Sequence, residues 1–184
     1  RWMYADDIKP YGSFGNGSAM RVSSVGWLFD SEEAVLDEAR KSAECTHNHP
    51  EGIKGAQATA IAIFFSKKGK EKEFIKEYIS RNFGYEFNKT VYVLHETYSF
   101  NETCRGTVPE ALTCFFESHS FEDAIRKAIY IGGDSDTIGA IVGGIAEAFY
   151  GIPDELAKKT RSYLPDDMLG VLKLFEEVYS TLEE

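Results

Sequence analysis

The sequence predicts an all-α domain, and three observations support this prediction. Capping residues recur along the chain, apolar residues repeat at helical spacing between them, and only one segment alternates like a strand. The 184 residues, 43% of them apolar, are enough for one globular domain with a substantial core. No linker-like tract, low-complexity segment or fixed-period repeat interrupts the sequence, so we interpret residues 1–184 as a single domain.

In the first half of the chain, three segments are predicted to be helices. Asp30 with Glu33 resembles a capping pair that opens a helix through about Ala43. Residues 55–65 are rich in small side chains and almost wholly apolar, which predicts a buried helix. In residues 70–82, apolar residues recur at helical spacing with Lys and Glu between them, which predicts a helix with one apolar and one charged face. The apolar face of that helix is formed by Phe74, Ile75, Tyr78 and Ile79.

The second half of the chain predicts further helices and one ambiguous segment. Residues 90–100 alternate enough to form a strand or an extended connector, and both interpretations stay open. Pro109 fits the first turn of a helix that runs to about residue 117. Ser120 with Asp123 predicts the start of a helix that ends near residue 131. Three more helices are expected over residues 136–150, 153–163 and 165–182.

Composition excludes several classes of function. With 20 basic and 30 acidic residues, the formal charge is −10, which argues against a nucleic-acid-binding surface but permits one phosphorylated small ligand at a local site. The longest apolar stretches, such as residues 58–65, are too short to span a membrane. Cys45, Cys104 and Cys114 are odd in number and lack paired spacing, which predicts reduced thiols and a cytoplasmic protein.

A candidate metal site lies in the sequence Gly-Gly-Asp-Ser-Asp-Thr at residues 132–137. Two carboxylates at positions i and i+2 can converge on a turn, which the glycines permit, and Thr137 adds a hydroxyl. Such hard oxygen ligands suit Mg²⁺, Mn²⁺ or Ca²⁺. The alternative is simple helix capping by aspartate. An EF-hand loop starting at Asp134 does not fit, because its twelfth position holds Ile145 rather than glutamate.

Two further segments could contribute to a ligand site. Residues 13–21 form a glycine turn that leads into a helix with Ser18 near its N-cap, and exposed N–H groups there could bind phosphate or carboxylate. Residues 46–52 (Thr-His-Asn-His-Pro-Glu-Gly) follow a helix. No third ligand accompanies His47 and His49 nearby, so zinc is not expected. One histidine either hydrogen-bonds in a ligand pocket or caps the preceding helix.

Taken together and in this order, the segments resemble the ADP-ribosylglycohydrolase family, which includes dinitrogenase-reductase-activating glycohydrolase and the J1 crystallins. The matching stretches are residues 13–27, 42–58, 106–111 and 121–152, and the similarity covers nearly the whole chain. The resemblance implies an all-α, orthogonal multi-helix domain. It also implies an enzyme that hydrolyses the bond at the anomeric carbon of an ADP-ribosyl group and releases ADP-ribose.

The resemblance also implies a cofactor and a set of site residues. Family members use two Mg²⁺ ions, or Mn²⁺ in some cases, and the ligands expected in this chain are Asp134, Asp136 and Thr137. His47 would approach the ribose. The expected partner is ADP-ribose or an ADP-ribosylated substrate, with a homo-oligomer as a further possibility. The ribose–diphosphate cleft would be lined by Gly15, Asn16, Gly17, Ser18, Met20 and Arg21.

One part of the family pattern has no counterpart in this sequence. Family members carry an upstream acidic stretch and a Thr-Asp-Asp or Ser-Asp-Asp motif, whereas Asp6-Asp7 lacks the preceding Thr and lies too close to the glycine turn. We therefore expect a domain incomplete at its N-terminus, with the catalytic carboxylate upstream of Arg1 and poor hydrolysis by this chain alone. The alternative is a non-catalytic ADP-ribose-binding or structural remnant of the family.

Overall fold

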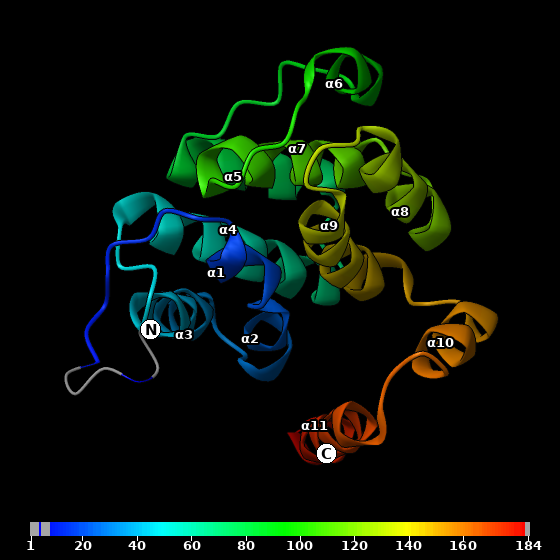
Figure 1. Cartoon of the computed structure of the whole chain (residues 1–184). Helices are drawn as coiled ribbons and strands as arrows, with labels where there is room; N and C mark the ends of the chain where they lie inside the picture. The colour runs from blue at the N-terminus through cyan, green and yellow to red at the C-terminus, as the bar shows by residue number, and fades with distance from the viewer. Residues whose placement is uncertain (1–3, 5–7, 183–184) are drawn as a thin grey trace.

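The computed structural model describes residue 4 and residues 8–182, and in this part of the chain eleven helices follow one another without any strand (Figure 1). The all-α prediction is therefore confirmed, although there are more helices than the sequence led us to expect. The Asp6-Asp7 pair lies outside the described residues. The helices are α1 (Gly17–Met20), α2 (Ser23–Leu28), α3 (Glu32–Glu44), α4 (Pro50–Lys67), α5 (Lys72–Phe83), α6 (Val91–Thr97), α7 (Cys104–Phe116), α8 (Phe121–Tyr130), α9 (Ser135–Tyr150), α10 (Asp154–Arg161) and α11 (Asp166–Leu182).

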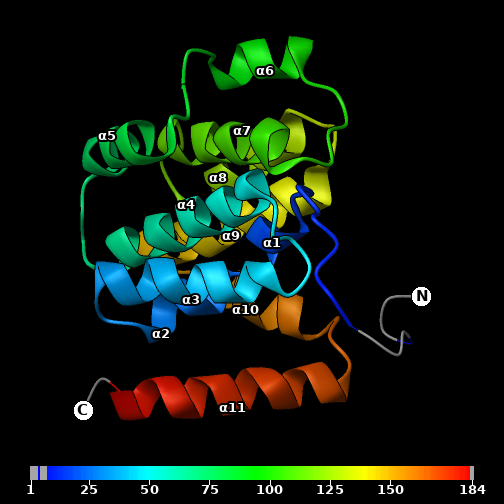
Figure 2. The ribbon, with the colours of Figure 1, turned by 90° about the vertical axis from the view of Figure 1, so that its left-hand side faces the viewer.

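Helices α4 and α9 form the middle of the molecule, with other helices stacked on both sides. In Figures 1 and 2, α5, α7 and α8 lie on one side of this central pair, and α6 lies beyond α7. Helices α2 and α3 lie on the opposite side. The predicted buried helix is confirmed, because residues 58–66 of α4 are all buried. Burial of this length of apolar chain on every face makes α4 the centre of the core.

Glycines allow neighbouring helices to approach α4 closely. A Cβ atom built on Gly26 of α2 would lie only 2.6 Å from the Cβ of Ile63. A Cβ on Gly55 of α4 itself would overlap the Sγ of Cys104 at the start of α7. Larger residues at these two positions would force the helices apart. No helix in residues 8–182 has the length and apolar content needed to cross a membrane.

The N-caps that the structure shows correct one sequence-based prediction. The hydroxyl of Ser31, and not Asp30, begins α3 by accepting a hydrogen bond of 3.2 Å from the N–H of Ala34. Ser120 begins α8 as predicted, accepting a hydrogen bond of 3.1 Å from the N–H of Asp123. Both hydroxyls satisfy an N–H group that has no partner within the helix. Asp30 instead forms an exposed ion pair with Lys68.

The ambiguous segment 90–100 contains a helix, so both the strand and the extended connector were wrong for its greater part. The hydroxyl of Thr90 caps α6 by accepting a hydrogen bond of 3.3 Å from the N–H of Val93. Val91 and Leu94 are buried, whereas Val93 is 40% exposed. The buried positions therefore follow the i, i+3 spacing of a helix, and a seven-residue helix is too short for its period to be read from the sequence.

The prediction that Pro109 lies in the first turn of its helix is also wrong. Helix α7 begins earlier, where the hydroxyl of Thr103 accepts a hydrogen bond of 3.1 Å from the N–H of Gly106. Pro109 is therefore inside the helix, where it provides no N–H for the carbonyl four residues earlier. The Thr103 cap and the burial of the following residues stabilise α7 and offset the free energy lost with this hydrogen bond.

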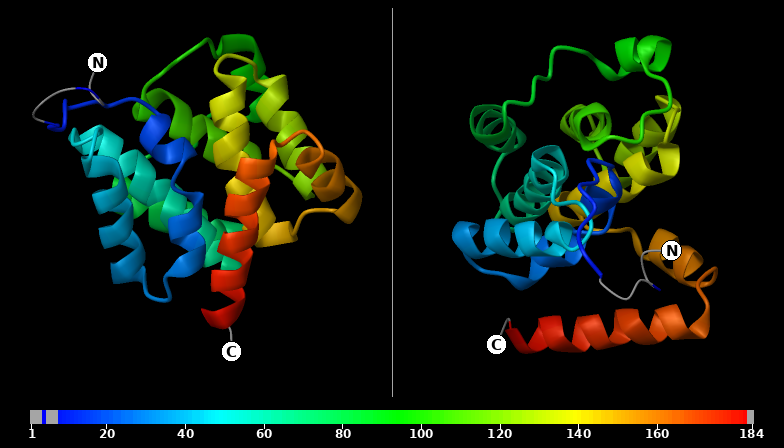
Figure 3. Two further views of the ribbon diagram at one scale, coloured as in Figure 1. Left: turned by 60° about the horizontal axis from the view of Figure 1, so that its bottom comes forward. Right: turned by 60° about the vertical axis from the view of Figure 1, so that its left-hand side comes forward.

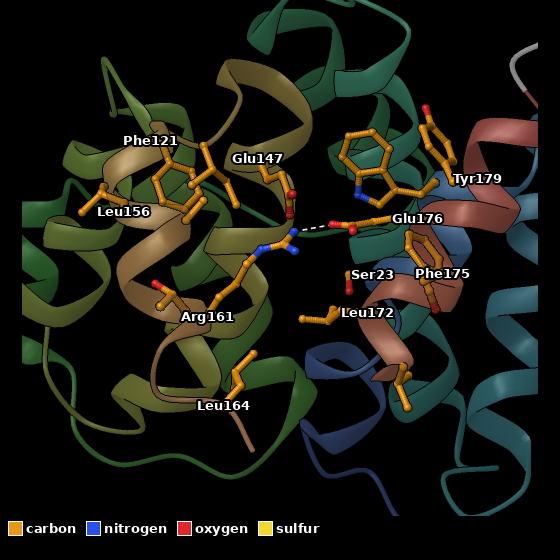
Figure 4. A pocket seen from close by; sticks show the side chains of 16 residues that line it. Ser23, Phe121, Glu147, Leu156, Arg161, Leu164, Leu172, Phe175, Glu176 and Tyr179 are labelled. Carbon is orange, nitrogen blue, oxygen red and sulfur yellow. Dashed lines mark hydrogen bonds and ion pairs between the residues drawn. The ribbon is translucent and has the colours of Figure 1, made fainter. Parts of the chain in front are cut away.

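Helices α10 and α11 extend from the main body as an arm. Figures 2 and 3 show α11 running along one side of the domain. A groove of about 630 Å³ lies between the arm and the body. In Figure 4, Arg161 of α10 points to Glu176 of α11 across this groove, and the two form an ion pair. Tyr179 of α11 meets the ring of Trp27 edge-on, with 5.5 Å between the ring centroids.

Candidate functional site

The glycine turn is anchored to the segment that precedes α7. The N–H of Asn16 donates a hydrogen bond of 2.8 Å to the carbonyl of Glu102, and the N–H of Cys104 donates one of 3.0 Å to the carbonyl of Phe14. These two bonds surround the isolated bridge between Gly15 and Thr103. The position of the turn is therefore set by residues almost ninety positions away along the chain.

Asn16 connects this turn to the acidic loop. Its buried amide nitrogen donates hydrogen bonds to Asp134 Oδ2 at 2.6 Å, to Thr107 Oγ1 at 3.0 Å and to the carbonyl of Asn101 at 3.2 Å. Thr107 in turn donates to the same carbonyl of Asn101 at 2.8 Å. The amide oriented in this way holds the Asp134 carboxylate in one position. Asn16 was predicted to line the ligand cleft, but its side chain is directed to the acidic loop.

The glycines of the acidic loop provide the backbone conformation that the turn requires. Gly132 and Gly133 have φ angles of +75° and +66°, which other residues rarely adopt. The ring of Tyr98 lies where a Cβ on Gly133 would be placed. This packing leads the chain sharply out of α8 and into α9, so that Asp134 stands at the start of α9 and faces Asn16.

Simple capping does not explain Asp134. Asp134 is the N-cap residue of α9, but its side chain accepts no capping hydrogen bond from the helix. It is only 9% exposed, so its carboxylate is held inside the protein by Asn16. A hydrogen bond with Asp134, followed by backbone N–H groups including that of Thr137, lowers the pKa of the exposed Asp136 carboxyl. This cause of the pKa shift indicates that the two carboxyl groups lie near each other.

These residues fit part of a site for a hard cation. Two neighbouring carboxylates repel each other unless a proton or a cation lies between them. The hydroxyl of Thr137 is close by and donates to the sulfur of Met20 at 3.6 Å. The described part of the chain holds no group of three or more His, Cys, Asp and Glu side chains around one point. The available donors are thus two carboxylates and one hydroxyl, which are all oxygen atoms of the kind that Mg²⁺ prefers.

The two histidines of the segment 46–52 have different positions. His47 is 7% exposed and lies against the glycine turn, where Cβ atoms built on Gly15 and Gly17 would be 3.4 Å and 3.3 Å from its Nε2. The interpretation that a histidine caps the preceding helix is wrong for His49, which is the N-cap residue of the following helix, α4. Its Nδ1 accepts a hydrogen bond of 3.1 Å from the N–H of Glu51.

A hydrogen-bonded group of three side chains surrounds His47 Nδ1. Thr46 Oγ1 lies 2.7 Å from this nitrogen, and Arg21 Nη2 lies 3.4 Å from it. The same Nη2 donates a hydrogen bond of 2.8 Å to Thr46 Oγ1. Burial, and then the charge of Arg21, lower the pKa of His47. Both effects favour the neutral imidazole, because each penalises the protonated ring.

The remaining predicted site residues lie on α1 or next to it. Asn16, and not Ser18, is the N-cap residue of this short helix, so that prediction was wrong. The buried hydroxyl of Ser18 donates a hydrogen bond of 2.7 Å to the carbonyl of Gly52, which fastens α1 to α4. Met20 is 43% exposed and reaches Thr137. The glycine turn, the histidine segment and the acidic loop are therefore brought together, as the sequence predicted.

Sequence reasoning gave no role to several residues that support the site. Thr107 belongs to the stretch 106–111 that matched the family, and Thr46 begins the histidine segment, so both were within recognised motifs. Tyr98 lies in the segment 90–100, which was predicted to be a strand or a connector, and Asn101 directly follows it; no sequence pattern marked either residue. Their contribution depends on contacts with residues far away in the sequence.

Comparisons with known proteins identify the family to which this chain belongs. The sequence model described as ADP-ribosylglycohydrolase matches residues 2–182. ADP-ribosylhydrolase ARH3 of Homo sapiens is 27% identical over 86% of this chain and 57% of its own length. The ADP-ribosyl-dinitrogen-reductase glycohydrolase of Rhodospirillum rubrum is 29% identical over 79% of this chain and 50% of its own length.

A solved structure shows the same fold. The ADP-ribosylglycohydrolase-related protein complex superimposes with a TM-score of 0.67 at 25% identity, covering 98% of this chain and 63% of that chain. The chain thus spans about half the length of the curated relatives it matches. Since the family's sequence model matches residues 2–182, which is nearly the whole chain, this chain belongs to the ADP-ribosylglycohydrolase family.

Proposed function

We propose that this protein catalyses the metal-dependent hydrolysis of ADP-ribosyl groups and releases ADP-ribose. The observation that carries the proposal is the 2.6 Å hydrogen bond from Asn16 to Asp134, which joins the glycine turn and the acidic loop into one site. The names of the relatives, an ADP-ribosylhydrolase and an ADP-ribosyl-dinitrogen-reductase glycohydrolase, support this class of substrate.

The metal in this proposal is Mg²⁺ or Mn²⁺. Asp134, Asp136 and Thr137 would hold it at the start of α9, because they are the oxygen donors that converge there. A bound cation of this kind compensates negative charge and orients a water molecule and the ribose hydroxyls. The buried position of Asp134 and its fixed hydrogen bond prepare one ligand before any cation binds.

The chain's other site residues would bind and orient the ADP-ribosyl group. Gly15 and Gly17 leave space beside His47 Nε2 that a side chain would fill, so a ligand can approach the backbone there. Arg21 supplies positive charge next to this space in a protein whose formal charge is −10. Such local charge favours a diphosphate at a site that the overall charge would otherwise repel.

The test is the release of free ADP-ribose from an ADP-ribosylated protein, measured with Mg²⁺, with Mn²⁺ and with EDTA. We expect slow release by this chain alone, which requires the cation and is lost in the Asp134→Asn/Asp136→Asn double variant. The matched control is Asp166→Asn/Asp167→Asn, which changes two exposed carboxylates in the first turn of α11. Release that continues in EDTA would contradict metal dependence. Binding of ADP-ribose without release would identify a binding protein instead of an enzyme.

A further inference from the structure

The hydrogen bonds around His47 determine which of its two ring nitrogens carries the proton. Neutral histidine has one N–H donor and one acceptor nitrogen, and the partners of each nitrogen decide which is which. His47 Nδ1 faces both Arg21 Nη2 at 3.4 Å and Thr46 Oγ1 at 2.7 Å. The guanidinium of arginine has only N–H donors and no acceptor. A proton on Nδ1 would therefore point at a cationic donor.

Thr46 completes the same arrangement. Its Oγ1 accepts a hydrogen bond of 2.8 Å from Arg21 Nη2, and its own hydroxyl proton is then free to be donated. His47 Nδ1, at 2.7 Å, is the acceptor in its reach. The donors thus run in one direction, from Arg21 to Thr46 and from Thr46 to His47. This direction leaves the ring proton on Nε2.

His47 Nε2 faces the glycine turn. Cβ atoms built on Gly15 and Gly17 would lie 3.4 Å and 3.3 Å from Nε2, so the turn passes next to this nitrogen. Within residues 8–182, both side-chain hydrogen bonds of the His47 ring involve Nδ1, and Nε2 has no hydrogen-bond partner. His47 as a whole is only 7% exposed, but Nε2 is not among the buried side-chain atoms that lack a partner in the described residues, so this nitrogen keeps access to water or to a ligand. An oxygen atom of a ligand held at the turn could replace water as the acceptor for an Nε2 proton.

We propose that Arg21 and Thr46 are positioning residues, which fix His47 as the neutral tautomer with its proton on Nε2, ready to donate a hydrogen bond to an oxygen of the bound ligand. The identity of that ligand as an ADP-ribosyl compound rests on the proposed function, whereas the tautomer does not. Arg21 then contributes to binding through His47 in addition to its charge. The imidazole acts as a hydrogen-bond donor and not as a general base, since its basic nitrogen is already engaged.

The direct test is two-dimensional NMR of the protein labelled with ¹⁵N at histidine, which distinguishes the two tautomers and the imidazolium by the pattern of ring correlations. The chain has four histidines, so a His47→Gln variant assigns the signals of His47. Near neutral pH, we expect the Nε2–H pattern in the protein without ligand. An Nδ1–H pattern or an imidazolium at His47 would overturn the proposal.

Variants of the two positioning residues provide the second test. Thr46→Val and Arg21→Met should each produce a mixture of tautomers, whereas Thr46→Ser, which keeps the hydroxyl, should retain the Nε2–H pattern. The matched controls are Thr113→Val, whose hydroxyl donates to Pro109 within α7, and Arg81→Met on the exposed face of α5. Circular dichroism confirms that each variant is folded. Unchanged tautomers in both Thr46→Val and Arg21→Met would show that these residues do not position His47.

Calorimetry with ADP-ribose as the probe connects the tautomer to binding. His47→Gln places an amide donor near the position of Nε2 and should keep most of the affinity. His47→Ala should weaken binding about tenfold, as expected for one lost hydrogen bond. Equal affinity of His47→Ala and the wild type would contradict the role as a donor. If the wild type shows the Nε2–H pattern but does not bind ADP-ribose, the tautomer assignment stands and the proposed function fails.

Discussion

Asn16 and Asp134 are 118 positions apart in the sequence, and yet the amide of Asn16 donates a hydrogen bond of 2.6 Å to the carboxylate of Asp134. The same amide is held by Thr107 and by the carbonyl of Asn101, so it has little freedom to rotate. A carboxylate that is oriented by a fixed donor keeps the geometry needed for a metal ligand. The glycine turn therefore contributes to the acidic site through Asn16 as well as to the ligand cleft.

Replacing Asn16 should weaken metal binding without direct loss of a metal ligand. In Asn16→Ala, Asp134 loses its donor, and we expect the affinity for Mn²⁺ to fall by about tenfold to a hundredfold, the usual cost of removing an outer-shell partner of a ligand. Calorimetric titration with Mn²⁺ measures the change. Asn82→Ala, on the exposed surface of α5, is the matched control. Equal Mn²⁺ affinity of Asn16→Ala and the wild type would show that Asp134 does not need this hydrogen bond.

Replacing Gly17 by valine should impair the binding of ADP-ribose. The added Cβ would lie 3.3 Å from His47 Nε2, and the branched side chain would occupy the space through which a ligand reaches the turn. We expect a loss of at least about tenfold in affinity, since the hydrogen bond from Nε2 would be blocked. Gly170→Val on α11, where a Cβ meets no atom within 4 Å, is the control. A folded Gly17→Val variant with wild-type affinity would mean that the turn is purely structural.

The lowered pKa of His47 predicts a particular dependence of stability on pH. In the unfolded chain, His47 takes up a proton near its ordinary pKa of 6.5, whereas burial and Arg21 delay this protonation in the folded protein. As the pH falls through 6.5, the unfolded state binds more protons and the free energy of unfolding decreases until His47 is protonated in the folded state also. No such penalty exists above the ordinary pKa.

Urea unfolding of the wild type and of His47→Gln over a series of pH values tests this expectation. The two proteins share all other titrating groups, so the difference between their free energies of unfolding isolates His47. We expect the wild type to lose stability relative to His47→Gln as the pH falls through 6.5. A difference that does not change with pH would show that the pKa of His47 is the same in both states.

Lys72 should contribute more to stability than an ordinary surface lysine. Its ammonium group donates to the carbonyls of Phe115 and Ser118 at 2.8 Å and 2.6 Å, beyond the end of α7. The hydroxyls of Ser118 and Tyr150 donate to the same two carbonyls, but Lys72 is their charged donor. It also lies 4.9 Å from the centroid of the Phe115 ring. We expect Lys72→Met to lower the free energy of unfolding by about 1–3 kcal/mol, because these carbonyls lose a charged donor.

Chemical denaturation of Lys72→Met and Lys158→Met provides the measurement. Lys158 is exposed on α10, so its replacement should change the free energy of unfolding by less than about 0.5 kcal/mol. A Lys72→Met variant as stable as Lys158→Met would show that water replaces the ammonium group at the end of α7 without cost.

The sequence by itself determined the all-α class, most of the helices and the three segments that meet at the site. These features are local: an apolar face, a capping hydroxyl such as that of Ser120, or a glycine pair before Asp134 each act within a few residues. Where two local signals competed, the sequence was insufficient. Asp30 and the neighbouring Ser31 were both possible N-caps of α3, and the structure uses Ser31. Pro109 indicated a later start for α7 than the one that the cap at Thr103 sets.

Only the tertiary structure decided what each site residue does. Asn16 turns to Asp134, Ser18 turns to the carbonyl of Gly52, and His47 is oriented by Arg21. Each of these contacts joins residues that are separated by at least 26 positions, so no window of sequence contains both partners. The direction of a polar side chain depends on which donor or acceptor the packing of the helices brings within about 3 Å, and that packing is a property of the whole core.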